Sequence, residues 1–155
     1  MTDPTAVPPT PTPTGEFASW GPRFGAYIID IAPIIVLTIV MTALFGENSA
    51  GDGSFSAELS GFPALVQFIL VIGWFVYNWL LGQGRTGQTL GKKTMKIGVF
   101  AAGTRNPIGP GLTFVRQLAH ILDGIPCLIG YLWPLWDSEK RTFADMIMNT
   151  RLYKV

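Results

Sequence analysis

Two long apolar runs restrict this chain to folds that place helices in a membrane. Residues 24–45 carry a single charge, Asp30, and residues 62–81 carry none. At a rise of about 1.5 Å per residue, a helix of about 20 residues spans the roughly 30 Å hydrocarbon core of a bilayer. We therefore predict two transmembrane helices, over 24–45 and 62–81.

The composition agrees with an integral membrane protein and argues against several soluble classes. Charged residues make up 14% of the 155-residue chain and hydrophobic residues 48%, whereas soluble domains usually carry about a quarter charged residues. The formal net charge of +1 argues against nucleic-acid binding. The single cysteine, Cys127, excludes an intrachain disulfide and a CxxC metal or redox site. We expect the lipid bilayer as a partner, with no metal and no cofactor.

The two loops that follow these helices carry charges of opposite sign. The segment 46–61 carries acids but no lysine or arginine, whereas 82–111 carries bases but no acid. The acids are Glu47, Asp52 and Glu58, and the bases are Arg85, Lys92, Lys93, Lys96 and Arg105. Because cytoplasmic loops are enriched in lysine and arginine, we expect the acidic loop outside and the basic loop, with the N-terminus, in the cytoplasm.

The first sixteen residues, 1–16, form a region rich in proline and threonine. It holds five of the twelve prolines and almost no apolar side chains. Such a composition cannot bury a core and favours an extended, disordered chain. We predict a disordered cytoplasmic tail, acting as a tether for a partner or as a passive extension, followed by a membrane domain over 17–155.

A third apolar stretch, 112–136, is broken by Gly124 and Pro126. Runs rich in β-branched and aromatic residues flank it at 94–100 and 150–155, and pairing them would satisfy their backbone groups. Pairing requires both runs on one side of the membrane. We therefore favour a helix, a break and a returning helix, or an interfacial helix followed by a short re-entrant one. A third full crossing is the alternative.

The C-terminal tail, 137–155, supports the returning arrangement. Its bases are Lys140, Arg141, Arg151 and Lys154. A third full crossing would place these four basic residues outside the cell, whereas lysine and arginine are usually enriched in cytoplasmic segments. The predicted fold class is an all-α membrane protein with two transmembrane helices, a broken third segment and a small cytoplasmic strand pair.

Asp30 is the one charged residue inside the first predicted helix. An ionisable side chain at mid-helix costs about 2.5–3.5 kcal/mol on insertion scales and usually faces a partner or a water-filled cavity. Arg23 precedes it by two helical turns on the same face, about 10 Å away along the axis. Two roles remain open for Asp30: a structural ion pair with an arginine of the last apolar segment, or the handling of protons or cations.

Ionisable residues also form a stripe along the first half of the third apolar stretch. Arg116, His120 and Asp123 follow one another at i, i+4 and i+7, so they share one helical face. His120 is the only histidine, and its imidazole suits a response near neutral pH. The stripe relays protons, pairs with Asp30 across the bundle, or forms the polar face of an interfacial helix.

The second predicted helix carries polar groups on one face. Gln67, Trp74 and Asn78 are spaced by seven and four residues, which places them together. We expect these side chains to form interhelical hydrogen bonds rather than to bind a substrate.

The basic loop is rich in glycine, but it does not form a nucleotide-binding P-loop. The spacing GxxxxGK[ST] fails, since Lys92 is followed by Lys93. Basic residues beside a membrane attract anionic lipid head groups at about 1 kcal/mol each. The candidates for such contacts are Arg85, Lys92, Lys93 and Lys96. Because the sequence contains no HExxH, GxSxG or CxxC motif, we do not expect an enzyme.

Several motifs occur in a fixed order along the chain. They are RFGAYIID from Arg23 to Asp30, GQTLGKK at 87–93, Arg116, RTFAD from Arg141 to Asp145, and Asn149-Thr150. Together they closely resemble the RDD family of small bacterial membrane proteins, over about residues 17–155. The family is named for one arginine and two aspartates, which the resemblance places at Arg23, Asp30 and Asp145. One departure is Phe143-Ala144, where many members have Leu-His, so a role for that histidine does not carry over.

The resemblance implies a multi-pass protein of the bacterial plasma membrane and suggests two functions. One is a transport or cation/proton exchange component, because antiport has been proposed for some members. Two helices and a hairpin are too few to enclose a pathway, so this function requires a homo-oligomer or a larger complex. The alternative is a non-catalytic accessory or assembly subunit of a larger membrane complex. The candidate ion-handling or ion-pairing residues are Arg23, Asp30, Arg116, His120, Asp123, Arg141 and Asp145.

Overall fold

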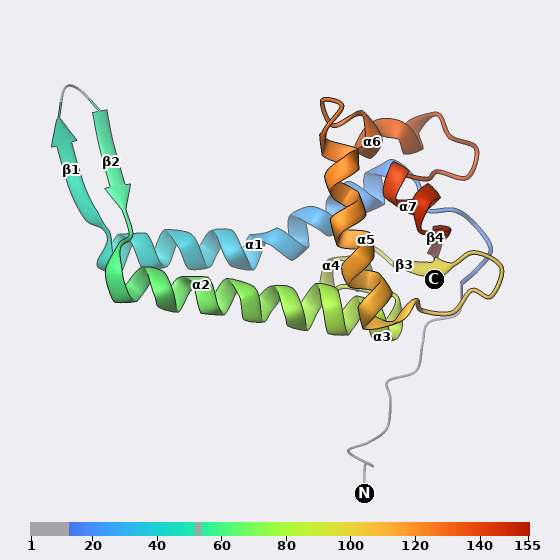
Figure 1. Ribbon diagram of the computed structural model, residues 1–155, viewed down its shortest axis with the longest axis horizontal. Helices are drawn as coiled ribbons and strands as arrows, with labels where there is room; N and C mark the ends of the chain where they lie inside the picture. Colours follow the sequence, from blue (N-terminus) through green and yellow to red (C-terminus); the bar gives the residue numbers. More distant parts are fainter. Residues whose placement is uncertain (1–12, 52–53) are drawn as a thin grey trace, which may run out of the picture.

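Two long helices lie side by side and form the elongated part of the molecule (Figure 1). The computed structural model describes residues 13–51 and 54–155. Helix α1 covers Trp20–Phe45, and α2 covers Gly61–Phe75. The second helix continues without a break through the π-helical segment η1, Val76–Gly82, and the short α3, Gln83–Thr86.

Both long helices are long and apolar enough to cross a membrane, which confirms the two predicted spans. The candidate spans are Trp20–Phe45 and Gly61–Thr86, with 26 residues each. The first helix therefore begins four residues before the predicted start at 24, and the second continues beyond its predicted end at 81. The π-helical η1 lies within the second span, and such segments shift the direction of the side chains that follow.

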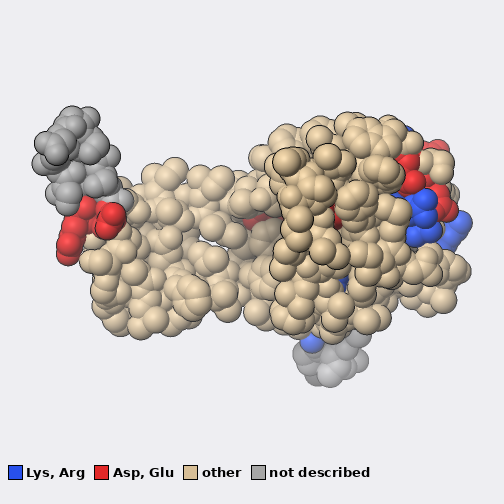
Figure 2. All heavy atoms as spheres, turned by 45° about the horizontal axis from the view of Figure 1, so that its top comes forward, with Lys and Arg blue, Asp and Glu red and all other residues tan. Residues whose placement is uncertain are grey.

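The acidic loop between the two spans contains an antiparallel hairpin that the sequence did not indicate. Strand β1, Glu47–Gly51, pairs with β2, Ser54–Glu58. Figure 2 shows acidic side chains at this end of the molecule, a long uncharged stretch over the paired helices, and further charges at the opposite end. The separation matches the predicted division of charge between the two loops.

At the other end of the long helices the chain folds into a small module of short helices and two strands (Figure 1). Its elements are α4 (Leu90–Thr94), β3 (Ile97–Ala101), α5 (Gly109–Gly124), α6 (Ile129–Leu132), η2 (Trp133–Leu135), α7 (Phe143–Ile147) and β4 (Thr150–Lys154). Strands β3 and β4 are antiparallel. The predicted pairing of 94–100 with 150–155 is thus confirmed.

The segment that leads into α1 lies along β4. Ala18 N donates to Leu152 O at 2.8 Å, and Lys154 N donates to Glu16 O at 2.9 Å. Thr14 N donates to Lys154 O, also at 2.9 Å. Residues 14–16 therefore belong to the ordered module rather than to the predicted tail 1–16. Residues 1–12 of that tail lie outside the described residues.

The third apolar stretch is a bent pair of helices. Its two arms, Gly109–Gly124 and Ile129–Leu135, meet at an angle of 105°. Cys127 and Leu128 form the bend with positive φ angles of 50° and 65°. Because β3 precedes the pair and β4 follows it in the same sheet, the chain leaves the module and returns to it. This course supports the favoured returning arrangement, and the two arms together are also long and apolar enough for one bent span.

Burial in helices α1, α2 and α5 is inverted relative to the helices of a soluble protein. Helix α2 buries no residue, and α1 buries only Ala26 and Asp30. Helix α5 buries Thr113, Arg116 and Asp123, while its large apolar side chains are exposed. An apolar exterior around a polar interior suits lipid rather than water. The chain is therefore a membrane protein in contact with the bilayer.

Candidate functional site: a buried polar core

The module surrounds three buried carboxylates, each held by different elements. We call these carboxylates and their bound groups the polar core. Its acids are Asp30 on α1, Asp123 on α5 and Asp145 on α7. Their exposed fractions are 1%, 0% and 0%. Because a buried charge is costly unless it is paired or hydrogen-bonded, the partners of each acid indicate what it does.

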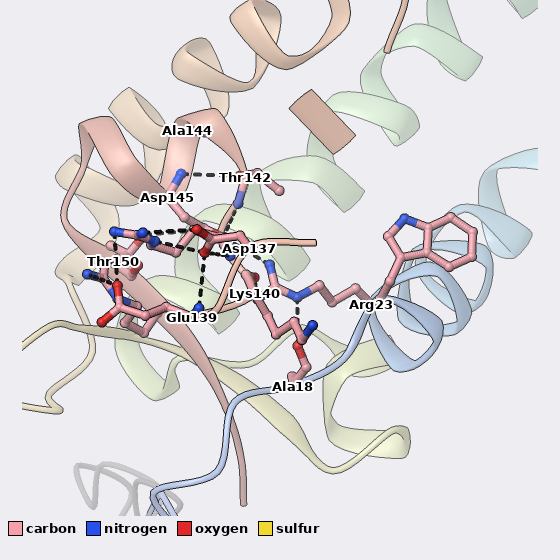
Figure 3. Close-up of polar contacts among 12 residues, drawn as sticks. Ala18, Arg23, Asp137, Glu139, Lys140, Thr142, Ala144, Asp145 and Thr150 are labelled. Atoms are coloured by element: carbon pink, nitrogen blue, oxygen red, sulfur yellow. Dashed lines mark hydrogen bonds and ion pairs between the residues drawn. The ribbon is translucent and has the colours of Figure 1, made fainter. Parts of the chain in front are cut away.

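Asp145 pairs with two arginines, Arg116 and Arg23, of which Figure 3 labels Arg23. Arg116 Nη2 lies 2.6 Å from Oδ1, and Arg23 Nη1 lies 2.9 Å from Oδ2. Thr150 Oγ1 adds a donor at 3.0 Å. Burial by itself raises the pKa of Asp145, but the Arg116 and Arg23 guanidinium groups outweigh it and hold the pKa below its ordinary value. The carboxylate therefore stays ionised and joins α1, α5 and α7.

Arg23 also binds backbone groups near Asp145 (Figure 3). Its Nε donates to Ala18 O at 3.2 Å, and its Nη2 donates to Lys140 O. The guanidinium thus joins the start of α1 to the segment before α7. A planar group with five donors suits this arrangement, and lysine would not reproduce it.

Local sequence determines where α7 begins and how Asp145 is oriented. Thr142 is the N-cap and accepts a hydrogen bond from Asp145 N at 3.2 Å, while Asp145 Oδ2 accepts one from Thr142 N at 3.2 Å. This reciprocal pair is a capping box. The same carboxylate therefore starts its own helix and receives both arginines.

Asp30 is held by neutral donors. Oδ1 accepts from Asn78 Nδ2 at 2.8 Å and from Gly91 N at 2.7 Å. Oδ2 accepts from Thr89 Oγ1 at 2.5 Å. Asn78 Oδ1 in turn accepts from Leu90 N at 2.8 Å. Asp30 and Asn78 together bind the first N–H groups of α4, which would otherwise lack partners.

Gly91 allows α4 to approach α1 this closely. A Cβ atom at this position would lie 2.0 Å from the carbonyl oxygen of Ala26. Only glycine fits against the α1 backbone one turn from Asp30. The GQTLGKK segment is thus explained as a docking site between α4 and α1.

Asp123 binds α7 in the same manner. Its Oδ1 accepts from Phe143 N at 2.8 Å and from Ala144 N at 3.3 Å. His120 Nδ1 lies 2.5 Å from Oδ2, and its ring stacks on Tyr131 with centroids 5.6 Å apart. The imidazole therefore holds a carboxylate that is already bound to a helix terminus.

Lys92 points inward, unlike the other predicted head-group residues. Its Nζ donates to Gln83 Oε1. Burial, reinforced by the charge of Arg116, lowers the pKa of Lys92 to about 7. The remaining candidates, Arg85, Lys93 and Lys96, are exposed. The predicted lipid-contact set is therefore divided between one core residue and three surface residues.

The structure brings some predicted site residues together and separates others. Arg23, Arg116 and Asp145 form one cluster. Arg141 lies outside it and pairs with Asp137 and Glu139, each at 2.9 Å. Among the described residues, Arg23 and Arg116 are the arginines that pair with Asp145.

The predicted ion pair between Asp30 and an arginine is wrong, because the described contacts of Asp30 are all to uncharged groups. The predicted stripe on α5 is also divided. Arg116 binds Asp145, while His120 binds Asp123. Within the described residues, no three His, Cys, Asp or Glu side chains are grouped as a metal site requires.

Polar contacts between the two spans confirm the predicted interhelical face. Gln67 Nε2 donates to Thr38 Oγ1 at 3.1 Å, and Trp74 Nε1 donates to Asp30 O at 3.0 Å. Sequence reasoning missed Thr89 and Thr142 as the N-caps of short helices. For Thr142 a signal was present, since Thr142 to Asp145 reads T-x-x-D, the pattern of a capping box.

Comparison with known proteins shows which family the chain is similar to. The RDD family model matches residues 17–149. The "Proline-rich antigen homolog" of Mycobacterium tuberculosis (strain CDC 1551 / Oshkosh) is 37% identical over 152 residues, covering 89% of this chain and 63% of that protein. The "Proline-rich antigen" of Mycobacterium leprae (strain TN) is 35% identical, covering 89% of this chain and 61% of that protein.

The chain thus spans less than two thirds of the length of these relatives. No solved structure matches it. The family match covers the two spans, the bent pair and α7, and it includes Arg23, Asp30 and Asp145. On this match and on the mycobacterial relatives, the chain belongs to the RDD family of bacterial membrane proteins.

Proposed function

We propose that the chain is a non-catalytic accessory or assembly subunit of a larger complex in the bacterial plasma membrane. The observation that carries this proposal is that each buried carboxylate is occupied by groups of the chain itself. Asp145 binds two arginines, while Asp30 and Asp123 each bind the N-terminus of a short helix. Such contacts build a rigid platform beside the membrane.

A carrier site has different requirements from this core. It must bind its ion and then release it, so its ligands have to exchange between the ion and other partners. If Asp30 exchanged its ligands, Gly91 N and Thr89 Oγ1 would lose their acceptor and α4 would be uncapped. The polar core is therefore better suited to hold the module on the spans than to carry cargo.

The distribution of charge supports an orientation for the subunit. The described acids Glu47 and Glu58 lie at the hairpin end, and Arg85, Lys93 and Lys96 are exposed near the module. By the positive-inside rule the module and the N-terminus face the cytoplasm. A cytoplasmic platform on two spans offers its apolar helix faces to lipid or to the helices of a partner.

Purification from native membranes tests the assembly role. The tagged chain is solubilised in mild detergent, and co-purifying proteins are quantified by mass spectrometry. We expect one partner in stoichiometric amount, retained by Arg141→Met and lost by Arg116→Met, because only Arg116 belongs to the polar core. A clean homo-oligomer with nothing attached would contradict the proposal.

Cation/proton exchange is the second candidate, and one observation favours it. Lys92 lies within electrostatic range of Asp30, and its lowered pKa of about 7 allows it to change charge near neutral pH. Exchange is measured in everted membrane vesicles prepared from cells that express the chain. Sodium/proton exchange in the wild type that is lost in Asp30→Asn and Lys92→Met would favour this candidate over the assembly role. If neither substitution changes the rate of exchange, Asp30 and Lys92 do not take part in the exchange reaction.

Contact with anionic lipid is a further part of the proposal. Arg85, Lys93 and Lys96 are exposed on or beside α3 and α4, next to the end of the second span. Each basic residue at such a surface contributes about 1 kcal/mol toward anionic head groups. Replacing all three with glutamine should reduce the enrichment of phosphatidylglycerol around the reconstituted chain, as measured by native mass spectrometry. An unchanged lipid profile would contradict this part.

A further inference from the structure

The sequence around Asp30 occurs a second time around Asp123. Residues 23–30 read RFGAYIID, and residues 116–123 read RQLAHILD. Both segments have an arginine and an aspartate seven residues apart, with the same alanine at the fourth position and the same isoleucine at the sixth. One segment lies on α1 and the other on α5.

A second pair of segments has the same backbone course. Thr89 and Thr142 are N-caps with φ, ψ of −83°, 173° and −83°, 172°. Each precedes a five-residue helix, and the C-caps of these helices are Met95 and Met148, with φ, ψ of −85°, 1° and −87°, 1°. One residue with positive φ follows in each case, and then a five-residue strand begins. The two segments match at a constant offset of 53 positions throughout.

The two aspartates make equivalent contacts. Asp30 accepts a hydrogen bond from Gly91 N, and Asp123 accepts one from Ala144 N. Gly91 and Ala144 are matched by the same offset of 53. Each aspartate on a long helix therefore binds the N-terminus of the short helix that belongs to its own half of the chain.

The strand register shows how the two halves are related. Val99 pairs with Leu152, its own match at the offset of 53, and lies at the centre of the β3–β4 pair. Ile97 pairs with Lys154, and Ala101 pairs with Thr150. Exchanging the two halves converts each of these outer pairs into the other. A local two-fold axis therefore passes between Val99 and Leu152.

We infer that the chain consists of two copies of one unit, α1–α2–α4–β3 and α5–α6–α7–β4, related by this axis. The copies differ in the length of their helical hairpin, since 61 positions separate Asp30 from Gly91 and 21 separate Asp123 from Ala144. The bent pair is thus a shortened form of the transmembrane hairpin. This explains why α5 and α6 turn back instead of crossing.

The repeat makes positions 92 and 145 equivalent. Asp145 binds Arg23 of the first copy and Arg116 of the second. Lys92 lies within electrostatic range of the same two arginines. The arginines of both copies therefore converge on one carboxylate, which is supplied by the second copy. A carboxylate at position 92 would approach the same arginines from the first copy.

An exchange of charge between the two positions tests the repeat in the full-length chain. Asp145→Lys alone places a third cation beside Arg23 and Arg116. Combining it with Lys92→Asp returns one carboxylate to the arginines from the equivalent position. The matched control combines Asp145→Lys with Lys93→Asp, because Lys93 is the exposed neighbour of Lys92 and has the same charge. The Tm in detergent and the yield of monodisperse protein are measured for each variant.

Equivalence of the two positions predicts a specific rescue. Asp145→Lys should lower both Tm and monodisperse yield, and adding Lys92→Asp should recover at least half of the loss. Adding Lys93→Asp should recover none of it. Rescue by both second substitutions, or by neither, would contradict the equivalence. If Asp145→Lys alone yields no folded protein, the comparison of yields between the two double variants still decides the question.

Discussion

Asp30 shows how a costly carboxylate inside an apolar helix is accommodated by hydrogen bonds from uncharged groups. Its two oxygens accept hydrogen bonds from an amide side chain, a backbone N–H and a hydroxyl group. Hydrogen bonds to a charged group are stronger than those between neutral groups. The backbone donor also lies at a helix N-terminus, where negative charge is favoured. Asp30 therefore stabilises the contact between α1 and α4.

Asp30→Asn tests this role directly. The amide keeps one acceptor oxygen but replaces Oδ2 with an NH2 group, so the Thr89 hydroxyl loses the acceptor of its hydrogen and the bond from Gly91 N is no longer made to a charged group. We expect the free energy of unfolding in detergent to fall by about 1–3 kcal/mol, the cost of a buried unsatisfied group. Glu58→Gln, at an exposed acid of the hairpin, should leave it unchanged. Equal stability of wild type and Asp30→Asn would show that the carboxylate does not hold α4.

Arg116 is the second residue whose removal should be costly. Arg116→Met leaves the buried Asp145 with only Arg23, and removing one partner of a buried ion pair costs about 3–5 kcal/mol. Arg141→Met removes a surface pair with Asp137, for which the expected loss is at most about 1 kcal/mol. Denaturant titration of both variants measures the difference. Similar losses for the two would contradict a special role for the buried pair.

Lys92 should make stability depend on pH above neutrality. Its pKa is about 7 in the folded chain and lies at the ordinary value of 10.5 in the unfolded chain. Between these values the unfolded chain binds a proton that the folded chain does not, so folding becomes more favourable as pH rises. The Tm of wild type relative to Lys92→Met should therefore increase from pH 7 to pH 9. A constant difference over this range would show that the pKa of Lys92 is not lowered in the folded chain.

At the scale of elements, α4 lies directly against the backbone of α1. Gly91→Ala would place a Cβ atom 2.0 Å from Ala26 O, so α4 must move and the hydrogen bonds to Asp30 must lengthen. Gly73→Ala is the matched control, because no atom lies within 4 Å of its added Cβ. Hydrogen exchange of the backbone N–H groups of α4 should be faster in Gly91→Ala and unchanged in Gly73→Ala. Equal protection in both variants would contradict the close docking.

The elements were predictable from sequence where one local pattern was sufficient. The length of the two apolar runs predicted the two spans, and the runs rich in β-branched residues predicted the β3–β4 pair. The hairpin between the spans was missed because its segment, rich in glycine and serine, lacks the alternation typical of strands. Helices α4 and α7 were missed because five residues are too few for a periodic pattern, and both depend on tertiary caps from Asp30 and Asp123.

The sequence predicted which residues belong to the candidate site, but it did not predict which of them contact one another. Charges in apolar segments pointed to Arg23, Asp30, Arg116 and Asp123, all of which lie in the polar core. Their partners depend on how α5 lies across the ends of the two spans, which helical periodicity alone does not specify. The carboxylates of Asp30 and Asp123 accept hydrogen bonds from backbone N–H groups. Because nearly every residue carries such a group, the sequence does not indicate which ones these carboxylates bind.

At the scale of the whole molecule, the module and the hairpin lie at opposite ends of the paired helices (Figure 1). The N-terminal segment, β3 and β4 meet in one layer of the module. Every strand of that layer must lie on one side of the membrane. We therefore propose that the C-terminus lies on the same side as the basic loop and that the hairpin lies on the other.

Cysteine accessibility in whole cells tests this topology most directly. Cys127 is first replaced by serine, and single cysteines are introduced as Glu58→Cys in the hairpin and Val155→Cys at the end of the module. A membrane-impermeant maleimide is applied before and after permeabilisation. We expect immediate labelling at position 58 and labelling at position 155 only after permeabilisation. Immediate labelling at both positions would contradict the returning arrangement of the bent pair, and with it the polar core on which the account rests.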